Sequence, residues 1–438
     1  MNEDAEINPM KEDLNFNVGA EIDENNQKLK KKKFLIYLSI FLLLLVIIIV
    51  IILIINLNSK PTDEKEKEKK DDSEEDDKWN WVPKWDKLKT RWGANLTIDK
   101  VWQEYPRPQL ERKLWLNLNG PWSYKISENS ENIPEKMDDK ILVPFCLESP
   151  LSGVKTFLYE NQTLFYEKQF TIPKDWINKK VLLHFGAVDW KCTLYINGVK
   201  VGEHEGGYSA FYFDITKNLN LNGKNKIILK VIDPTDKGYQ PVGKQNLNPH
   251  NYWYHPVSGI WQTVWLEPVS DNYIEKLEIN NDYDNKKIKI IFKTNSDKEL
   301  PINITLKYNN SKIEQLEDKS NREIIIQLQD KDFHDWSPAE PNLYTISAEL
   351  YSENGDTLDS IQSYTAIRKV ESREDSDGYP RIYLNNKPIF NMGILEQGYW
   401  PDGLYTPPSE EALIFDIQKI KSLGLNIIRK HIKVEPYS

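Results

Sequence analysis

A strand–helix–strand pattern at residues 389–436 constrains the fold more than any other feature of this 438-residue chain. The apolar segment 389–395 predicts a short strand, residues 409–423 have helical periodicity, and residues 426–434 are apolar again. Two short strands that are joined by a helix of this length predict a parallel βαβ unit.

The helix ends and the polar face of the second strand are also visible in the sequence. Ser409 is suited to cap the helix, and Gly424 stands where a left-handed residue ends one. In a regular strand Arg429, His431 and Lys433 share one face. Parallel strands are normally apolar on both faces, so this face indicates either a solvated edge or a site at the carboxyl end of a barrel strand.

The motifs in this region resemble a known enzyme family. The run DIQKIKSLGLNIIRKHIKVEP at 416–436, preceded by QGYWPDG at 397–403, is similar to the start of the catalytic (β/α)8 barrel of glycoside hydrolase family 2. That family contains β-galactosidases, β-glucuronidases and β-mannosidases. Its acid/base and nucleophile are glutamates on later barrel strands, and residues 372–438 supply about two of the eight strands. No catalytic residue is therefore assigned in this chain.

The resemblance implies five substrate-binding candidates: Arg429, His431, Glu396, Trp400 and Asp402. Arg429 and His431 are expected to orient the nucleophile and to hydrogen-bond sugar hydroxyls. The family's commonest pattern has one more residue between this arginine and histidine, but one branch has RKHIKVEP as here. Glu396 stands where that branch more often has aspartate.

The N-terminal 78 residues predict a membrane anchor. Residues 34–55 contain no charge, which is enough helix to cross about 30 Å of hydrocarbon. Lysines within 28–33 precede this segment, so 34–56 is expected to be a signal anchor with residues 1–33 as a disordered cytoplasmic tail. A nuclear-localisation or nucleic-acid patch is the alternative for the lysines. Residues 57–78 are charged and predict a stalk, which places the domains outside the cell or in a lumen.

Residues 79–270 predict an all-β sandwich. Asn-Gly pairs that begin at Asn119, Asn197 and Asn222 lie between apolar runs and predict hairpins, because both central residues of a type I′ turn need a positive φ. The segments LVPFCLESPLSGV, FGAVDWKCTLYINGVKVGEHEGGYSAFYFDIT and VSGIWQTVWLEPV resemble the family's N-terminal sugar-binding jelly roll.

In the family, loops of this jelly roll contribute to the edge of the active site. The resemblance makes Asp189, Asp233 and the loop 238–255 candidates for sugar contacts, with a structural turn or core residue as the alternative.

Residues 271–371 predict a second, smaller sandwich. Short alternating runs are separated by turns rich in Asn, Asp and Gly. WSPAEPNLY and SYTAIRKVE resemble the end of the family's immunoglobulin-like domain, from which Thr365 and Ala366 depart. The Asn385–Asn386 pair predicts a hairpin that leads into residues 389–395.

Composition excludes several other functions. The net charge is −10, with 57 basic and 67 acidic residues, so an extended nucleic-acid surface is not expected. The six histidines have no metal-ligand spacing, and no metal or cofactor is expected. Cys146 and Cys192 either pair or remain two buried thiols.

The expected fold is mainly β: a jelly roll, an immunoglobulin-like sandwich and an incomplete (β/α)8 barrel, behind one transmembrane helix. The expected function is that of the front portion of a membrane-anchored β-glycosidase, with a β-glycoside as its binding partner and no hydrolytic activity of its own. An inactive, membrane-tethered carbohydrate-binding protein and a truncated gene product are the alternatives. We also expect residues 381–438 to be only marginally ordered in isolation, because strands 389–395 and 426–434 lack covering elements.

Overall fold

The computed structural model describes residues 79–128 and 130–436. The predicted tail, anchor and stalk lie outside these residues, so they stay predictions. Within the described ranges, every helix is too short or too polar to cross a bilayer.

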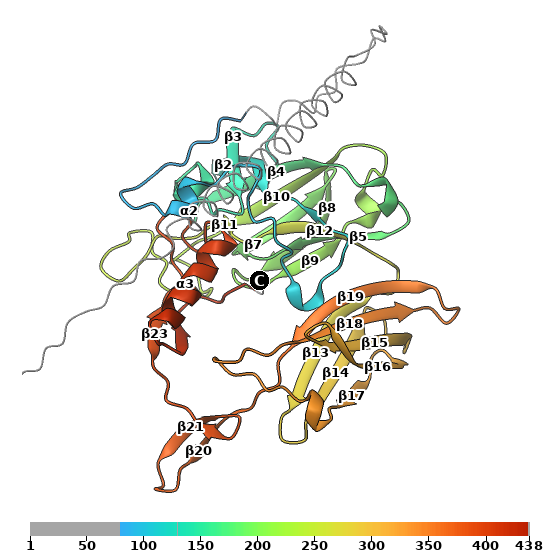
Figure 1. The fold of residues 1–438 in the computed structure, drawn as a ribbon. Coiled ribbons are helices and arrows are strands. Elements are labelled where there is room, and N and C mark those ends of the chain that lie inside the picture. The colour runs from blue at the N-terminus through green and yellow to red at the C-terminus, as the bar shows by residue number, and fades with distance from the viewer. Residues whose placement is uncertain (1–78, 129, 437–438) are drawn as a thin grey trace, which may run out of the picture. The chain divides into compact units, whose positions relative to one another are not determined.

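The first sandwich consists of two main antiparallel sheets, which Figure 1 shows in cyan and green. One has the order β1-β12-β5-β9 and the other β3-β2-β4-β10-β7-β8, while β6 and β11 form a separate pair. The strands are β1 (Leu116–Asn117), β2 (Gly120–Glu128), β3 (Asp139–Val143), β4 (Gln162–Phe170), β5 (Lys180–Phe185), β6 (Val188–Asp189), β7 (Lys191–Ile196), β8 (Val199–Glu205), β9 (Phe211–Asp214), β10 (Asn225–Ile232), β11 (Gly259–Ile260) and β12 (Val264–Val269).

The core of this sandwich lies between its sheets because alternate side chains of each strand point inward. Leu194 on β7 and Leu229 on β10 are opposite each other and fully buried.

The short helical elements before and within the two sandwiches are α2 (Arg91–Ala94) and the 3-10 turns η2 (Pro108–Leu110), η3 (Pro150–Ser152), η4 (Lys174–Trp176), η5 (Thr216–Asn218) and η6 (Asp330–Asp332).

One of the three predicted Asn-Gly hairpins is confirmed. Asn197 and Gly198 have φ of 51° and 82° and join β7 to β8. The prediction at Asn119 is wrong, because β1 and β2 belong to different sheets and the Asn119 side chain instead accepts the Val264 N–H at 3.1 Å. The prediction at Asn222 is also wrong, since its N–H donates to the Asn220 side chain in a loop between η5 and β10.

The second sandwich has sheets of order β13-β14-β17 and β16-β15-β18-β19, shown in yellow and orange in Figure 1. Strict alternation along β18 buries Tyr344, Ile346, Ala348 and Leu350. The strands are β13 (Ile274–Asp282), β14 (Lys287–Thr294), β15 (Pro301–Tyr308), β16 (Ser311–Lys319), β17 (Glu323–Gln327), β18 (Tyr344–Tyr351) and β19 (Thr357–Thr365).

A buried ion network joins the two sandwiches. The Arg112 guanidinium donates to both carboxylate oxygens of Asp359 on β19, at 3.0 and 2.8 Å. It also donates to Glu267 on β12 at 3.1 Å. Paired, hydrogen-bonded charges of this kind fix geometry, because loss of one partner leaves an uncompensated buried charge.

The predicted βαβ unit is confirmed. β23 and β24 are parallel, with Gly393 opposite Ile427. The Ser409 side chain accepts the Ala412 N–H, and Gly424 has a φ of 83°. Asn385, with Asn386, turns the predicted hairpin. The elements are β20 (Val370–Glu374), β21 (Pro380–Leu384), β22 (Lys387–Pro388), β23 (Gly393–Glu396), α3 (Glu410–Ser422) and β24 (Ile427–Lys430).

The second strand of this unit is shorter than predicted. β24 ends at Lys430 rather than at Val434, and Ile432 has a φ of 65°. A left-handed conformation is unfavourable for a β-branched residue and ends the strand alternation. Arg429, His431 and Lys433 therefore do not share one regular strand face, which corrects that expectation.

Candidate functional site

The carboxyl ends of β23 and β24 bring together two of the predicted residues, Glu396 and His431. The Glu396 carboxylate accepts the Gly398 N–H at 2.5 Å and forms an ion pair with Lys430. The Glu396 carbonyl accepts the His431 N–H at 2.8 Å. This edge is where functional side chains gather in parallel α/β barrels.

Arg429 and His431 differ in environment. Arg429 lies opposite Leu395 in the strand register and is exposed. Its guanidinium makes no hydrogen bond or ion pair with residues 79–128 or 130–436. His431 is half-buried next to Glu396. Arg429 thus presents a solvated cation on the opposite face of β24 from Lys430, and His431 presents a partly shielded imidazole.

Trp400 and Asp402 lie on the loop that follows β23. Trp400 exchanges two backbone hydrogen bonds with Leu404, and its ring meets Trp92 edge-on at 6.3 Å between centroids. Asp402 is fully buried, and its carboxylate accepts the N–H and O–H of Thr90 at 2.8 and 2.7 Å. Asp402 therefore fastens this loop to the segment before the first sandwich, and its contact with substrate stays a prediction.

Lys433 also holds the loop that follows β23. Its ammonium donates to the carbonyls of Tyr405 at 2.7 Å and Gly398 at 3.2 Å. Burial lowers the pKa of Lys433 to about 8, although the neighbouring Glu435 carboxylate opposes this shift. The Lys433 side chain is only 1% exposed, so its role is to hold the loop rather than to meet solvent.

Side chains of the first sandwich reach this loop. Lys244 donates to the Gln397 side chain at 2.9 Å. Tyr254 stacks on Tyr399 at 4.1 Å between ring centroids, and Tyr399 contacts Tyr405 at 4.7 Å. The sequence prediction named the loop 238–255 as a whole but missed these partners, because more than 140 residues separate Tyr254 from Tyr399 and no local spacing reveals the contact.

The aspartates proposed for sugar contacts in the first sandwich are core residues. Asp189 accepts a hydrogen bond from Gln245 at 3.0 Å, and Asp233 accepts one from the Ser258 hydroxyl at 2.8 Å. Glu148 accepts the Ser258 N–H at 2.9 Å. Burial raises the pKa of Glu148 to about 8 and that of Asp233 to about 6. These carboxyl groups stabilise the loop that carries Lys244 and Tyr254.

Cys146 and Cys192 are separate buried thiols, which decides between the two alternatives for them. In the described part of the chain, three or more histidine, cysteine or acidic side chains nowhere converge into a set that could hold a metal.

Sequence comparisons identify both sandwiches. Residues 115–268 match the profile of glycosyl hydrolases family 2, sugar binding domain, and residues 272–368 match glycosyl hydrolases family 2. The chain contains two domains of glycosyl hydrolases family 2. The resemblance seen in the motifs of these two regions is thereby confirmed.

Curated family 2 relatives are enzymes that are longer than this chain. The β-galactosidase of Thermoanaerobacter pseudethanolicus is 29% identical over 340 residues, which cover 72% of this chain and 43% of that enzyme. The β-glucuronidase of Streptococcus agalactiae is 23% identical over 335 residues, which cover 72% of this chain and 52% of that enzyme. The chain thus spans about half or less of these relatives.

Solved structures share the fold. The crystal structure of Ruminococcus gnavus β-glucuronidase matches with a TM-score of 0.58 and 19% identity, covering 75% of this chain and 56% of that one. Its complex with D-glucuronic acid matches with the same TM-score. At this identity the likeness concerns the family 2 fold alone.

Proposed function

We propose that residues 79–436 form the sugar-binding domain, the second sandwich and the first βαβ unit of a family 2 β-glycosidase that hydrolyses O-glycosidic bonds. The parallel pairing of β23 with β24, directly after two family 2 domains, carries this proposal. A retaining mechanism needs two carboxyl groups about 5–5.5 Å apart. Barrel strands outside residues 1–438 supply both in this proposal.

Each predicted residue has a role consistent with its position. Arg429 and His431 hydrogen-bond sugar hydroxyls and orient the nucleophile. The Glu396 carboxylate positions Lys430 through their ion pair. The Glu396 backbone carbonyl positions His431 by accepting the His431 N–H. Trp400 offers an indole ring against the apolar face of a pyranose. Asp402 is proposed to bind substrate through its Oδ1, because Thr90 donates only to Oδ2 and Oδ1 has no hydrogen-bond partner among the described residues.

The same proposal places the protein in a membrane. Residues 34–56 anchor it, with the N-terminus in the cytoplasm and the domains on the extracellular or lumenal side. Protease added outside sealed vesicles should digest the domains and spare the tail. Cleavage of the tail with survival of the domains would contradict this orientation.

Two measurements test the hydrolytic proposal. Sequencing of the full-length transcript should show an in-frame continuation that encodes the two catalytic glutamates, and a stop directly after Ser438 would contradict the proposal. In the longer product, His431→Ala should lower kcat/KM for aryl β-glycosides by about 10² or more, because a transition-state contact is lost. Lys421→Ala, in the last turn of α3, is the matched control and should change kcat/KM little.

A further inference from the structure

Asn-X-Ser/Thr motifs, in which X is any residue except proline, occur in both sandwiches and in the segment before them. This motif is the acceptor for N-linked glycosylation, and the modified atom is the side-chain amide nitrogen of the asparagine. The asparagines in question are Asn95, Asn161, Asn303 and Asn309. All of them follow the predicted anchor, and residues 1–33 contain no such motif. Their surroundings in the fold differ, and the difference separates them into two groups.

Asn309 stands at the tip of the hairpin that joins β15 to β16. Asn309 and Asn310 have φ of 48° and 65°, as both central residues of a type I′ turn do. Asn309, Asn310 and Ser311 are exposed, and the Asn309 amide has no hydrogen-bond partner among the described residues. The acceptor amide and the hydroxyl of this motif therefore both belong to accessible side chains.

Asn95 is the second accessible acceptor. It follows the last residue of α2, and its backbone N–H donates to the Trp92 carbonyl at 3.1 Å. Asn95 and Thr97 are exposed, and the Asn95 side chain lacks a hydrogen-bond partner in the part of the chain that the structure describes. A surface turn of this kind can carry a bulky, hydrated group without displacement of packed side chains.

The other two asparagines are less suited to carry a glycan. The Asn161 amide nitrogen already donates to the Glu128 carboxylate at 2.7 Å. Asn303 is half-buried on the interior strand β15, opposite Glu317 of β16 and Glu349 of β18. Directly opposite side chains share one face of a sheet, so a glycan on Asn303 would have to displace its neighbours on both adjacent strands.

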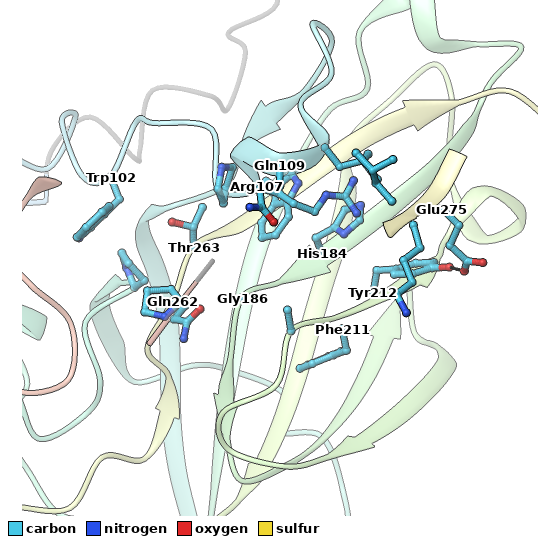
Figure 2. Close-up of a pocket in the computed structure, with 18 of the residues that line it drawn as sticks. Trp102, Arg107, Gln109, His184, Gly186, Phe211, Tyr212, Gln262, Thr263 and Glu275 are labelled. Carbon is cyan, nitrogen blue, oxygen red and sulfur yellow. Dashed lines mark hydrogen bonds between the residues drawn. The ribbon is translucent and has the colours of Figure 1, made fainter. Parts of the chain in front are cut away.

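The accessible acceptors also lie outside the cavity next to the candidate functional site. Figure 2 shows this cavity, which has a volume of about 640 Å³ and is lined in part by Tyr405 and Thr406 from the loop after β23. Neither Asn95 nor Asn309 belongs to its lining. Glycans on these two side chains would therefore be attached outside its wall.

We propose that Asn309 and Asn95 are N-glycosylated. The donor is an oligosaccharide that is linked through its C1 to a lipid diphosphate. The amide nitrogen forms a bond to C1 and loses one proton, while the bond from C1 to the phosphate oxygen breaks and the lipid diphosphate leaves. Acceptors of this class are found in secreted and lumenal segments, so the inference rests on the proposed orientation of the domains. It does not depend on the proposed hydrolysis.

The test is expression of the full 438-residue chain in a eukaryotic cell line, followed by peptide N-glycosidase digestion in heavy-oxygen water and mass spectrometry of the peptides. The digestion converts a glycosylated asparagine to aspartate and incorporates heavy oxygen, so it marks each occupied site. We expect the label at Asn309 and Asn95, and we expect none at Asn161 or Asn303.

Variants at the motifs check the same assignment by electrophoresis. Ser311→Ala removes the hydroxyl that the motif needs and leaves the left-handed Asn309 in the turn. It should raise the mobility of the chain by the equivalent of one glycan, and digestion should abolish the difference from the parent chain. Ser311→Thr keeps the motif and is the matched control, which should migrate like the parent. Asn95→Gln should remove the second glycan.

Protease digestion of sealed vesicles reads the orientation independently of any glycan. Unmodified Asn309 and Asn95 in a chain whose domains are extracellular or lumenal would overturn the inference and leave the proposed orientation intact. Domains on the cytoplasmic side would overturn both. Occupancy of only one of the two acceptors would overturn the assignment of the other, and a label confined to Asn161 or Asn303 would overturn both assignments.

Discussion

The first sandwich and the C-terminal βαβ unit both contain well-paired strands, but they differ in how far the apolar side chains of those strands are buried. Leu194 and Leu229, on neighbouring strands of the sandwich, are fully buried. Ile427 and Ile428 on β24 are 41% and 37% exposed, although β24 pairs with β23 along its whole length. Backbone pairing thus forms a strand pair in both regions, while only the sandwich provides a second layer that removes side chains from water.

The largest difference should appear in amide hydrogen exchange. Amides of the interior strands β7 and β10 should exchange only through global unfolding, whereas those of β23 and β24 should exchange through local opening, at rates faster by several orders of magnitude. The measurement is exchange on the full chain, resolved by peptide. Equal protection of Ile427–Lys430 and Lys191–Ile196 would break the comparison.

Side-chain truncation sharpens the same contrast. Leu194→Ala should lower the free energy of unfolding of the sandwich by about 2–5 kcal/mol, because it removes buried contacts and leaves a cavity. Ile427→Ala should change it by no more than about 0.5 kcal/mol, since its side chain already meets solvent. Urea denaturation followed by tryptophan fluorescence measures both. A loss above about 2 kcal/mol for Ile427→Ala would show that β24 is covered in solution.

Local signals explain which parts of the fold were predictable. The caps at Ser409 and Gly424 and the turn at Asn197 depend on neighbouring residues, and each was predicted correctly from sequence. Asn119 has the same local signal as Asn197, yet its side chain bonds to Val264, a residue 145 positions away. Tertiary pairing of this kind overrides a turn preference, and the sequence does not display it.

The candidate site was predictable only in part for the same reason. Glu396 and His431 lie together because a predicted βαβ unit aligns the ends of its strands. The hydrogen bond from Thr90 to Asp402 Oδ2 joins residues 312 positions apart and was missed. The early end of β24 also escaped prediction, because an apolar β-branched residue such as Ile432 gives no sign of a left-handed conformation.

The buried carboxyl groups of the sandwich should make its stability depend on pH. Burial raises the pKa of Glu148 from 4.5 to about 8, so the folded state keeps a proton that the unfolded state has lost. The contribution of Glu148 to the free energy of unfolding should therefore be largest below about pH 4.5. It should fall by on the order of 3 kcal/mol as the pH rises to 8. Glu148→Gln should flatten this slope in urea titrations at pH 5 and pH 8.

Glu267 is an internal control, because its effect on the pH dependence of stability is opposite to that of Glu148. Burial alone would raise its pKa, but Arg107, the His184 hydrogen bond and Arg112 together hold it below the usual range. Its contribution to stability is present above about pH 4.5 and is lost as the pH falls below that value. A Glu148→Gln variant that keeps the full alkaline slope would assign that slope to other groups, such as Asp233, whose pKa is also raised.

The smallest expected effect concerns the attachment of the βαβ unit to the sandwich. The Thr90 hydroxyl donates to the Asp402 carboxylate at 2.7 Å and accepts the Gly93 N–H at 3.0 Å, so one side chain caps α2 and holds the loop after β23. Thr90→Val keeps the shape and removes both bonds. It should cost about 1–2 kcal/mol, because Asp402 is buried and loses a charge-assisted partner.

Thr90→Ser retains the hydroxyl and is the matched variant, expected to stay within about 0.5 kcal/mol of the parent chain. The two variants differ from each other most clearly in hydrogen exchange of α2 and of residues 398–407, where only Thr90→Val should accelerate exchange. Some attachment should persist without the hydroxyl, because the Arg91 guanidinium lies over the rings of Trp92 and of Phe415 on α3, at 4.5 and 4.7 Å from their centroids, and the two rings contact each other at 5.1 Å. Indistinguishable exchange in the two variants would mean that these ring contacts, rather than the Thr90–Asp402 hydrogen bond, join the unit to the sandwich.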